Sequence, residues 1–154
     1  MKTNKTNLSV VSEVKLSYIN RVKANDRIKI GWSKDAYRLF KESWDHGTID
    51  AFETFKALYV NGANQVLGII TISTGGIRYA LADPAKVFCT AIKLHASGII
   101  LCHNHPSGTL KPSEQDKQLT ERMKHAGEVL GITILDHMII TREGYYSLAD
   151  EGVL

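Results

Sequence analysis

Four polar residues in the segment HNHPSGTLKPSEQD, residues 103–116, have the types and spacing of a catalytic metal site. His103 and His105 are two residues apart, and Ser113 and Asp116 follow at the start of a predicted helix. Two imidazoles and one carboxylate leave a fourth position for water on a tetrahedral zinc ion, which is typical of catalytic rather than structural zinc. Zinc lowers the pKa of a coordinated water to about 7, so hydroxide becomes available at neutral pH. The segment therefore predicts a hydrolytic zinc site with His103, His105 and Asp116 as ligands.

The elements on either side of this segment can bring these residues together. Residues 98–102, GIILC, are wholly apolar, which is typical of a central strand covered on both faces. Residues two apart on an extended chain point the same way, so both imidazoles can face one ion while Asn104 points away. Ser113 and Asp116 open the predicted helix 113–130 in a capping-box pattern, which by itself usually stabilises a helix by about 1 kcal/mol. The same geometry would direct the Asp116 carboxylate towards the histidines.

Hydrolysis at such a site also needs a general base, normally a carboxylate near the water. Glu53, at the start of the predicted strand ETFKALYV, is the candidate, although Glu42, Glu114 and Glu128 are also available by residue type. An HxH pair alone is a weak signal. The added serine and aspartate, after a buried strand and at a helix start, favour the metal site.

The rest of the chain predicts a mixed fold. Alternating or apolar runs indicate strands at residues 13–19, 27–30, 52–60, 65–73, 98–102, 132–140 and 145–148. Helical spacing follows Ser33 and Asp83-Pro84, with Ser33 and Asp83 as N-caps, and extends over residues 113–130. Strands that alternate with helices predict the α/β (α+β) class, with a mixed β-sheet sandwiched between helices.

Length and composition are those of one domain, with 154 residues, 44% hydrophobic and 23% charged. We expect a flexible tail over residues 1–11 and a single domain over 12–154. A net charge of +3 neither requires nor excludes nucleic acid as a partner. Cys89 and Cys102 lie in apolar surroundings and predict two buried, reduced thiols in a cytoplasmic protein. No signal peptide and no membrane span are expected.

The whole pattern resembles a known family. A glutamate, then HxH, then seven residues, then Ser-x-x-Asp is similar to the JAMM motif of JAB/MPN-domain metalloproteases. The strings HNHPSG, PSEQD and VLGITILDHMII resemble more narrowly the bacterial RadC branch, and ETFKALYVN resembles its Glu-x-Phe strand. The resemblance covers residues 49–148. The helical region that precedes this domain in RadC-like proteins is not expected here, because the sequence starts with a strand-like pattern.

The resemblance implies a reaction and a role for each site residue. It implies that His103, His105 and Asp116 hold one zinc ion per chain, that Glu53 activates water and that Ser113 stabilises the oxyanion. The implied reaction is hydrolysis of a peptide or isopeptide amide bond in a protein or peptide substrate. The implied fold is a mixed sheet flanked by helices, with a layout like that of cytidine deaminases.

Other functions fit parts of the sequence. The RadC branch has carried a DNA-repair label, so the alternative is a DNA-repair-associated protein that binds nucleic acid or serves as an accessory factor, without protease activity. HNH nucleases spread those three residues over a ββα unit, whereas here they are contiguous. A zinc nucleobase deaminase needs H-x-E and P-C-x-x-C, and the sequence has neither. An MPN domain that only binds partners would have lost its ligands. Asn104 stands where deubiquitinating members carry Ser or Thr, which weakens an inference of ubiquitin-like substrates.

Overall fold

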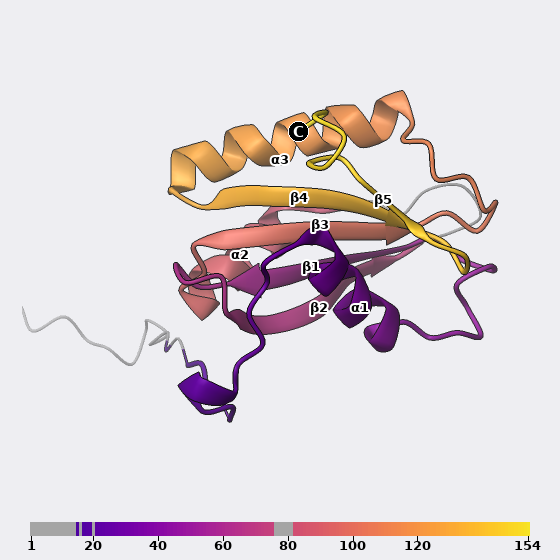
Figure 1. Ribbon diagram of the computed structural model, residues 1–154. Coiled ribbons are helices and arrows are strands. Elements are labelled where there is room, and N and C mark those ends of the chain that lie inside the picture. The colour runs from indigo at the N-terminus through magenta and orange to yellow at the C-terminus, as the bar shows by residue number, and fades with distance from the viewer. Residues whose placement is uncertain (1–14, 16, 20, 76–81) are drawn as a thin grey trace, which may run out of the picture.

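A computed structural model describes residues 15, 17–19, 21–75 and 82–154, which form one five-stranded sheet with helices on both faces (Figure 1). The strands are β1 (Thr54–Val60), β2 (Val66–Thr74), β3 (Gly98–Asn104), β4 (Thr133–Ile140) and β5 (Tyr145–Ser147), in the order β2-β1-β3-β4-β5. β3 and β4 run parallel, and every other neighbouring pair is antiparallel. The sheet is therefore mixed, as the sequence predicts.

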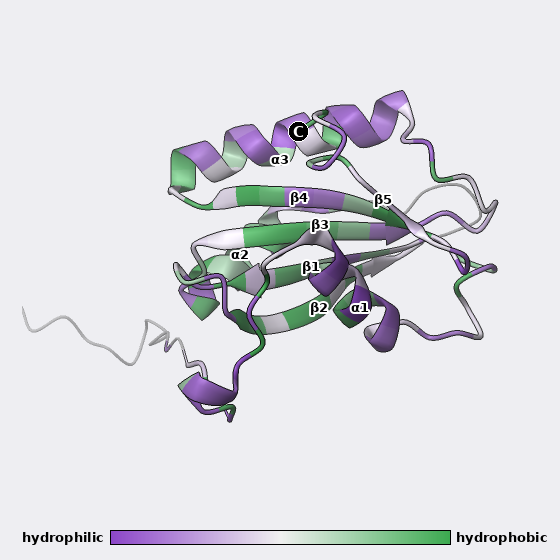
Figure 2. Cartoon of the chain, viewed as in Figure 1, coloured by the Kyte–Doolittle hydropathy of each residue, from purple (hydrophilic) through white to green (hydrophobic). Residues whose placement is uncertain are grey.

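The helices lie on opposite faces of this sheet and close two apolar cores. They are α1 (Ser33–Ser43), α2 (Pro84–Leu94) and α3 (Glu114–Leu130), with a short 3-10 helix η2 (Ala24–Asp26) before them. α1 covers one face, whereas α2 and α3 cover the other (Figure 1). The hydropathy colouring shows the apolar residues concentrated in the strands, with a polar outer side on α3 (Figure 2). The predicted sandwich of a sheet between helices is confirmed.

β3 is the central strand, and all seven of its residues are buried. Successive side chains of a strand point to opposite faces. Ile99 and Leu101 accordingly pack in the core under α2 and α3, and Ile100 and Cys102 pack in the core under α1. This alternation places His103 on the face covered by α2 and α3. Cys102 accordingly faces away from His103, into the core under α1.

α3 runs back along β4, so its first turn lies at the end of the sheet where β3 and β4 finish (Figure 1). At that turn Ser113 caps the helix, and its hydroxyl accepts a hydrogen bond from the Asp116 backbone N–H at 3.1 Å. The helix ends at Gly131, whose φ of 67° suits glycine. A Cβ on Gly127 would lie 2.3 Å from the carbonyl oxygen of Ile132, so α3 approaches the following segment more closely than a side chain would allow. A glycine at this position therefore lets the chain turn tightly from the end of α3 into β4.

Two predicted strands near the N-terminus are not regular strands in the described residues. Of residues 13–19, only 15 and 17–19 are described, and these are irregular; the hydroxyl of Tyr18 donates a hydrogen bond to the carbonyl of Leu67 at 3.0 Å. In residues 27–30 only Lys29 forms a bridge, to Gln65. The predicted tail, residues 1–11, lies outside the described residues. The predicted burial of Cys89 is wrong, because this residue lies on the outward face of α2; both cysteines are free.

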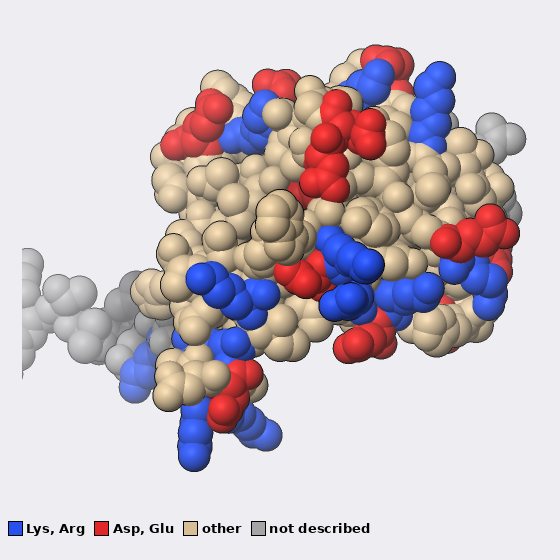
Figure 3. Space-filling view, viewed as in Figure 1, with Lys and Arg blue, Asp and Glu red and all other residues tan. Residues whose placement is uncertain are grey.

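The described surface carries both charge signs. On the face shown in Figure 3, Lys and Arg side chains are interspersed with Asp and Glu. Several form pairs, such as Arg142 with Asp50 at 2.5 Å and Lys117 with Glu114 at 2.7 Å. A surface of mixed sign is the ordinary solvated exterior of a domain. No helix within the described ranges has the length and apolar character needed to cross a bilayer.

Candidate metal centre

The three predicted metal ligands lie together where β3 ends and α3 begins. His103 is the penultimate residue of β3, His105 follows the strand, and Asp116 is in the first turn of α3. One ligand atom from each residue lies within 4.8 Å of the others. His103 is buried, whereas His105 and Asp116 are partly exposed, so the cluster is open to solvent on one side. The structure therefore brings together all three side chains that the sequence singles out.

The separations between these atoms fit one small cation. His103 Nε2 lies 2.9 Å from His105 Nε2 and 3.2 Å from Asp116 Oδ1, and His105 Nε2 lies 3.7 Å from Asp116 Oδ2. A tetrahedral zinc ion with ligand bonds of about 2.0–2.1 Å places its ligand atoms about 3.4 Å apart. The observed distances lie on both sides of this value. Two nitrogens and a carboxylate oxygen are also the donor types that zinc accepts.

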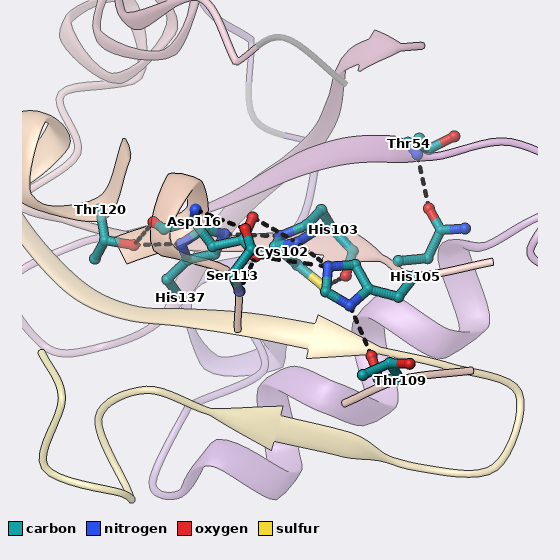
Figure 4. A network of polar contacts seen from close by, with 10 residues as sticks. Thr54, Cys102, His103, His105, Thr109, Ser113, Asp116, Thr120 and His137 are labelled. Atoms are coloured by element: carbon teal, nitrogen blue, oxygen red, sulfur yellow. Dashed lines mark hydrogen bonds and ion pairs between the residues drawn. The ribbon is translucent and has the colours of Figure 1, made fainter. Parts of the chain in front are cut away.

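The Nδ1 atom of each imidazole ring, on the side away from the cluster, is within hydrogen-bond distance of another group (Figure 4). His105 Nδ1 lies 2.6 Å from the carbonyl oxygen of Thr109. His103 Nδ1 lies 2.9 Å from Nε2 of His137, a buried residue of β4. Because both Nδ1 atoms are engaged elsewhere, the two Nε2 atoms face the centre of the cluster. Outer hydrogen bonds of this kind are usual for metal-binding histidines.

The electrostatics favour an ionised carboxylate. Burial alone would raise the pKa of Asp116, but hydrogen bonds with His103, His105 and Ser113 hold this pKa well below its usual range. Burial alone would lower the pKa of His105, yet the Asp116 carboxylate and the Thr109 carbonyl raise it overall. A carboxylate that is ionised throughout the neutral range is ready to bind a cation.

Glu53 lies on the same side of the sheet as the cluster. It directly precedes β1 and is half-buried, and its carbonyl oxygen accepts a hydrogen bond from the Gly75 N–H at 2.8 Å. Phe55, two residues further on, stacks on the ring of His103 with centroids 5.9 Å apart. Residues two apart on an extended segment share a face, and the negative charge of Glu53 contributes to the raised pKa of His105. Its role as general base stays a prediction.

Ser113 acts on Asp116 in two ways in this structure. Its backbone N–H and its hydroxyl both donate to Asp116 Oδ2, at 2.7 and 2.6 Å. The serine thus caps α3 and also aims the carboxylate at the histidines, and Oδ1 is left facing His103. The predicted role of Ser113 towards an oxyanion stays a prediction, because its only hydroxyl hydrogen is directed at Asp116 here.

The sequence pattern predicts a supporting rather than a ligating role for His137, with a hydrogen bond towards the site, and it gives no role to Thr120. Adjacent strand residues do point to opposite sides, as expected for Asp136 and His137, and His137 points towards His103. Thr120 is one helical turn beyond Asp116, and its hydroxyl lies 2.6 Å from His137 Nδ1. The sequence feature that could have identified Thr120 as a supporting residue is its position four residues after the candidate ligand Asp116, on the same face of the helix.

From the sequence we also expect two loops, residues 75–82 and 107–111, to shape a pocket beside the site. Most of the first, residues 75–82, lies outside the described residues. The second, residues 107–111, provides the Thr109 carbonyl and part of a shallow pocket of about 340 Å³. Its lining residues are Leu110, Lys111, Pro112, Lys117, Tyr146 and Val153. This pocket adjoins the start of α3.

Comparison with known proteins places the chain in a family. The model of the RadC-like JAB domain matches residues 30–153. A UPF0758 protein of Flavobacterium johnsoniae is 42% identical over 149 residues, which cover 95% of this chain and 63% of the relative. UPF0758 proteins of Thermotoga maritima and Aquifex aeolicus are 44% identical over 102 residues and 37% identical over 128 residues.

These relatives are longer than the present chain. The matches cover 66% of this chain and 46% of the Thermotoga maritima protein, and 83% of this chain and 54% of the Aquifex aeolicus protein. The chain thus spans less than two thirds of the length of these relatives. The family match nevertheless includes every described strand and all residues of the candidate metal centre. This chain belongs to the RadC-like JAB domain family.

Proposed function

We propose that this domain is a zinc-dependent hydrolase of the JAMM type that cleaves a peptide or isopeptide amide bond. The observation that carries the proposal is the convergence of His103 Nε2, His105 Nε2 and the Asp116 carboxylate at the end of β3, with Glu53 on the same face. Three protein ligands leave a coordination position open, which distinguishes a catalytic from a structural zinc site.

Each residue has a defined part in the proposed mechanism. A zinc ion held by the three ligands would supply a Lewis acid that polarises a water molecule and the substrate carbonyl. Glu53 takes a proton from the water and delivers it to the amine nitrogen that leaves, so the same carboxylate serves first as base and then as acid. Ser113 holds the Asp116 carboxylate in place through two hydrogen bonds. The partly exposed side of the cluster is where a substrate chain would enter.

The first test of this function is elemental analysis of purified protein. We expect about one zinc per chain, bound by three protein ligands. Protein that contains no metal and takes up none when zinc is added would contradict the proposal. Iron in place of zinc would also contradict it, because two histidines and one carboxylate are the ligands of non-haem iron oxygenases as well.

The second test separates metal binding from hydrolysis. Glu53→Gln should retain the zinc and lose cleavage of quenched fluorescent libraries of linear peptides and of lysine-linked isopeptides. Glu42→Gln, which alters an exposed glutamate of α1, is the matched control and should retain both. Loss of zinc in Glu53→Gln would make Glu53 a ligand rather than the base. If zinc-loaded wild-type protein cleaves neither library, the proposed hydrolase activity is contradicted.

A further inference from the structure

Behind His103 lies a chain of hydrogen bonds that the proposed reaction does not use directly (Figure 4). His103 Nδ1 is 2.9 Å from His137 Nε2, and His137 Nδ1 is 2.6 Å from the hydroxyl oxygen of Thr120. The same hydroxyl is 2.6 Å from the backbone carbonyl oxygen of Asp116. Thr120 and His137 are both buried, His137 completely. The chain therefore runs from one candidate ligand, through two buried side chains, to the backbone of another.

The direction of each hydrogen bond follows from counting hydrogens. A carbonyl oxygen only accepts, so the Thr120 hydroxyl must give its single hydrogen to Asp116. The hydroxyl must then accept from His137, which places a hydrogen on His137 Nδ1. A fully buried imidazole costs less when neutral, and the hydrogen bonds of the His137 ring within the described residues are to Thr120 and His103, neither of which is an acid. A neutral His137 has no hydrogen on Nε2, so Nε2 accepts from His103 Nδ1.

We propose that Thr120 and His137 are positioning residues that fix the tautomer of His103. With its hydrogen on Nδ1, His103 presents the lone pair of Nε2 to the centre of the cluster, which is the form that binds a metal. The functional consequence rests on the proposed metal site, whereas the tautomer itself does not. The Asp116 carbonyl sets the direction of the other hydrogen bonds in the chain. It can only accept a hydrogen, whereas the hydroxyl and the imidazoles can donate or accept.

The contrast with His105 explains why a threonine is needed. His105 Nδ1 faces the Thr109 carbonyl directly, and a carbonyl can only accept, so that ring needs no further support. His103 instead faces another imidazole, which can either donate or accept. Without Thr120, His137 could carry its hydrogen on Nε2 and donate to His103 Nδ1. His103 would then carry its own hydrogen on Nε2, where it would block the metal.

The test compares Thr120→Val with Thr120→Ser. Valine keeps the shape of threonine and removes the hydroxyl, whereas serine keeps the hydroxyl. The readout is the ¹⁵N NMR signals of the histidine ring nitrogens in metal-free protein, which report where each hydrogen lies. We expect wild type and Thr120→Ser to carry the hydrogens on His103 Nδ1 and His137 Nδ1. In Thr120→Val we expect His103 to shift towards the Nε2–H form.

A second readout is zinc affinity, measured by competition with a chromophoric chelator. Thr120→Val should bind zinc about 10–100-fold more weakly, which is the usual effect of losing an outer hydrogen bond of a metal-binding histidine. Thr120→Ser should bind as wild type does. A purely structural role for Thr120 would lower stability without changing the tautomer of His103.

The outcomes distinguish the two proposals. If His103 has the same tautomer in wild type and Thr120→Val, the positioning role is overturned, whatever the zinc affinity. If wild type binds no zinc but shows the expected tautomers, the positioning role stands and the proposed function is overturned. If Thr120→Val does not fold, the wild-type spectrum decides, because a hydrogen on His103 Nε2 would by itself overturn the inference.

Discussion

The side-chain oxygen of Asn104 accepts a hydrogen bond from the backbone N–H of Thr54 at 2.7 Å. Asn104 is the middle residue of the HxH pair, and Thr54 is the first residue of β1. The side-chain amide of Asn104 also donates to the carbonyls of Ile49 and Phe52, at 2.6 and 2.8 Å. The residue between two candidate ligands therefore holds the backbone on both sides of Glu53.

Replacement of Asn104 should destabilise the fold and loosen this segment. Asn104→Ala leaves three backbone groups without their partner, two of them buried and one partly buried, and each buried group costs about 1–3 kcal/mol. We expect the free energy of unfolding to fall by about 3 kcal/mol or more, as measured by urea denaturation of metal-free protein.

An exposed asparagine provides the control for this substitution. Asn25→Ala alters an exposed residue of η2 and should leave the unfolding midpoint unchanged. Equal midpoints for Asn104→Ala and wild type would show that the hydrogen bonds of Asn104 contribute nothing to the stability of this segment. Activity of Asn104→Ala should also fall more than its zinc content, because the substitution frees Glu53 and leaves the ligands in place.

Zinc should stabilise the protein through Asp116. A ligand that binds only the folded state adds about 2.7 kcal/mol when its concentration is 100 times its dissociation constant. We expect the thermal unfolding midpoint of wild type to rise with added zinc and to return when a chelator is added. Asp116→Asn, which keeps the size of the side chain and removes its charge, should lose most of this rise. Glu114→Gln, at an exposed acid two residues away, should behave as wild type; an equal rise in Asp116→Asn would exclude Asp116 as a ligand.

Asp136 should give the stability of the fold a pH dependence of its own. Burial raises the pKa of Asp136 from its ordinary 3.8, and this outweighs the hydrogen bonds from Ser147, Ala149 and His137 that lower it. The folded state therefore binds this proton more tightly than the unfolded state does. The resulting stabilisation is fully present below pH 3.8 and is lost as the pH rises through the folded pKa.

The variant Asp136→Asn isolates this contribution, because asparagine does not titrate. The free energy of unfolding of wild type minus that of Asp136→Asn should decrease as the pH rises from about 4 through the folded pKa, and then level off. Urea denaturation of metal-free protein at a series of pH values measures this difference. A difference that increases with pH would mean that the hydrogen bonds of Asp136 outweigh its burial.

The sequence by itself determined the three α-helices, the strands of the sheet and the candidate ligands, because those signals are local. Two strands predicted near the N-terminus, in contrast, are not regular strands among the residues that the structure describes. The apolar run of β3, the Asp83 cap of α2 and the Ser113 cap of α3 each depend on neighbouring residues and the period of the chain. The HxH pair and the Ser-x-x-Asp are likewise close in sequence. Once a strand ends at Asn104 and a helix starts after Ser113, few conformations keep these side chains apart.

Only the tertiary structure decided which groups from distant parts of the sequence contact the candidate ligands. The parallel register of β3 and β4 places His137 behind His103, and the packing of α3 on β4 places Thr120 behind His137. The antiparallel register of β1 and β3 pairs Phe55 with His103. Glu53 lies two residues before Phe55 on the same segment, and its charge contributes to the raised pKa of His105. Such pairings join residues that are tens of positions apart in the sequence. They depend on how whole faces of helices and strands pack to bury apolar surface. A local sequence pattern therefore does not predict them.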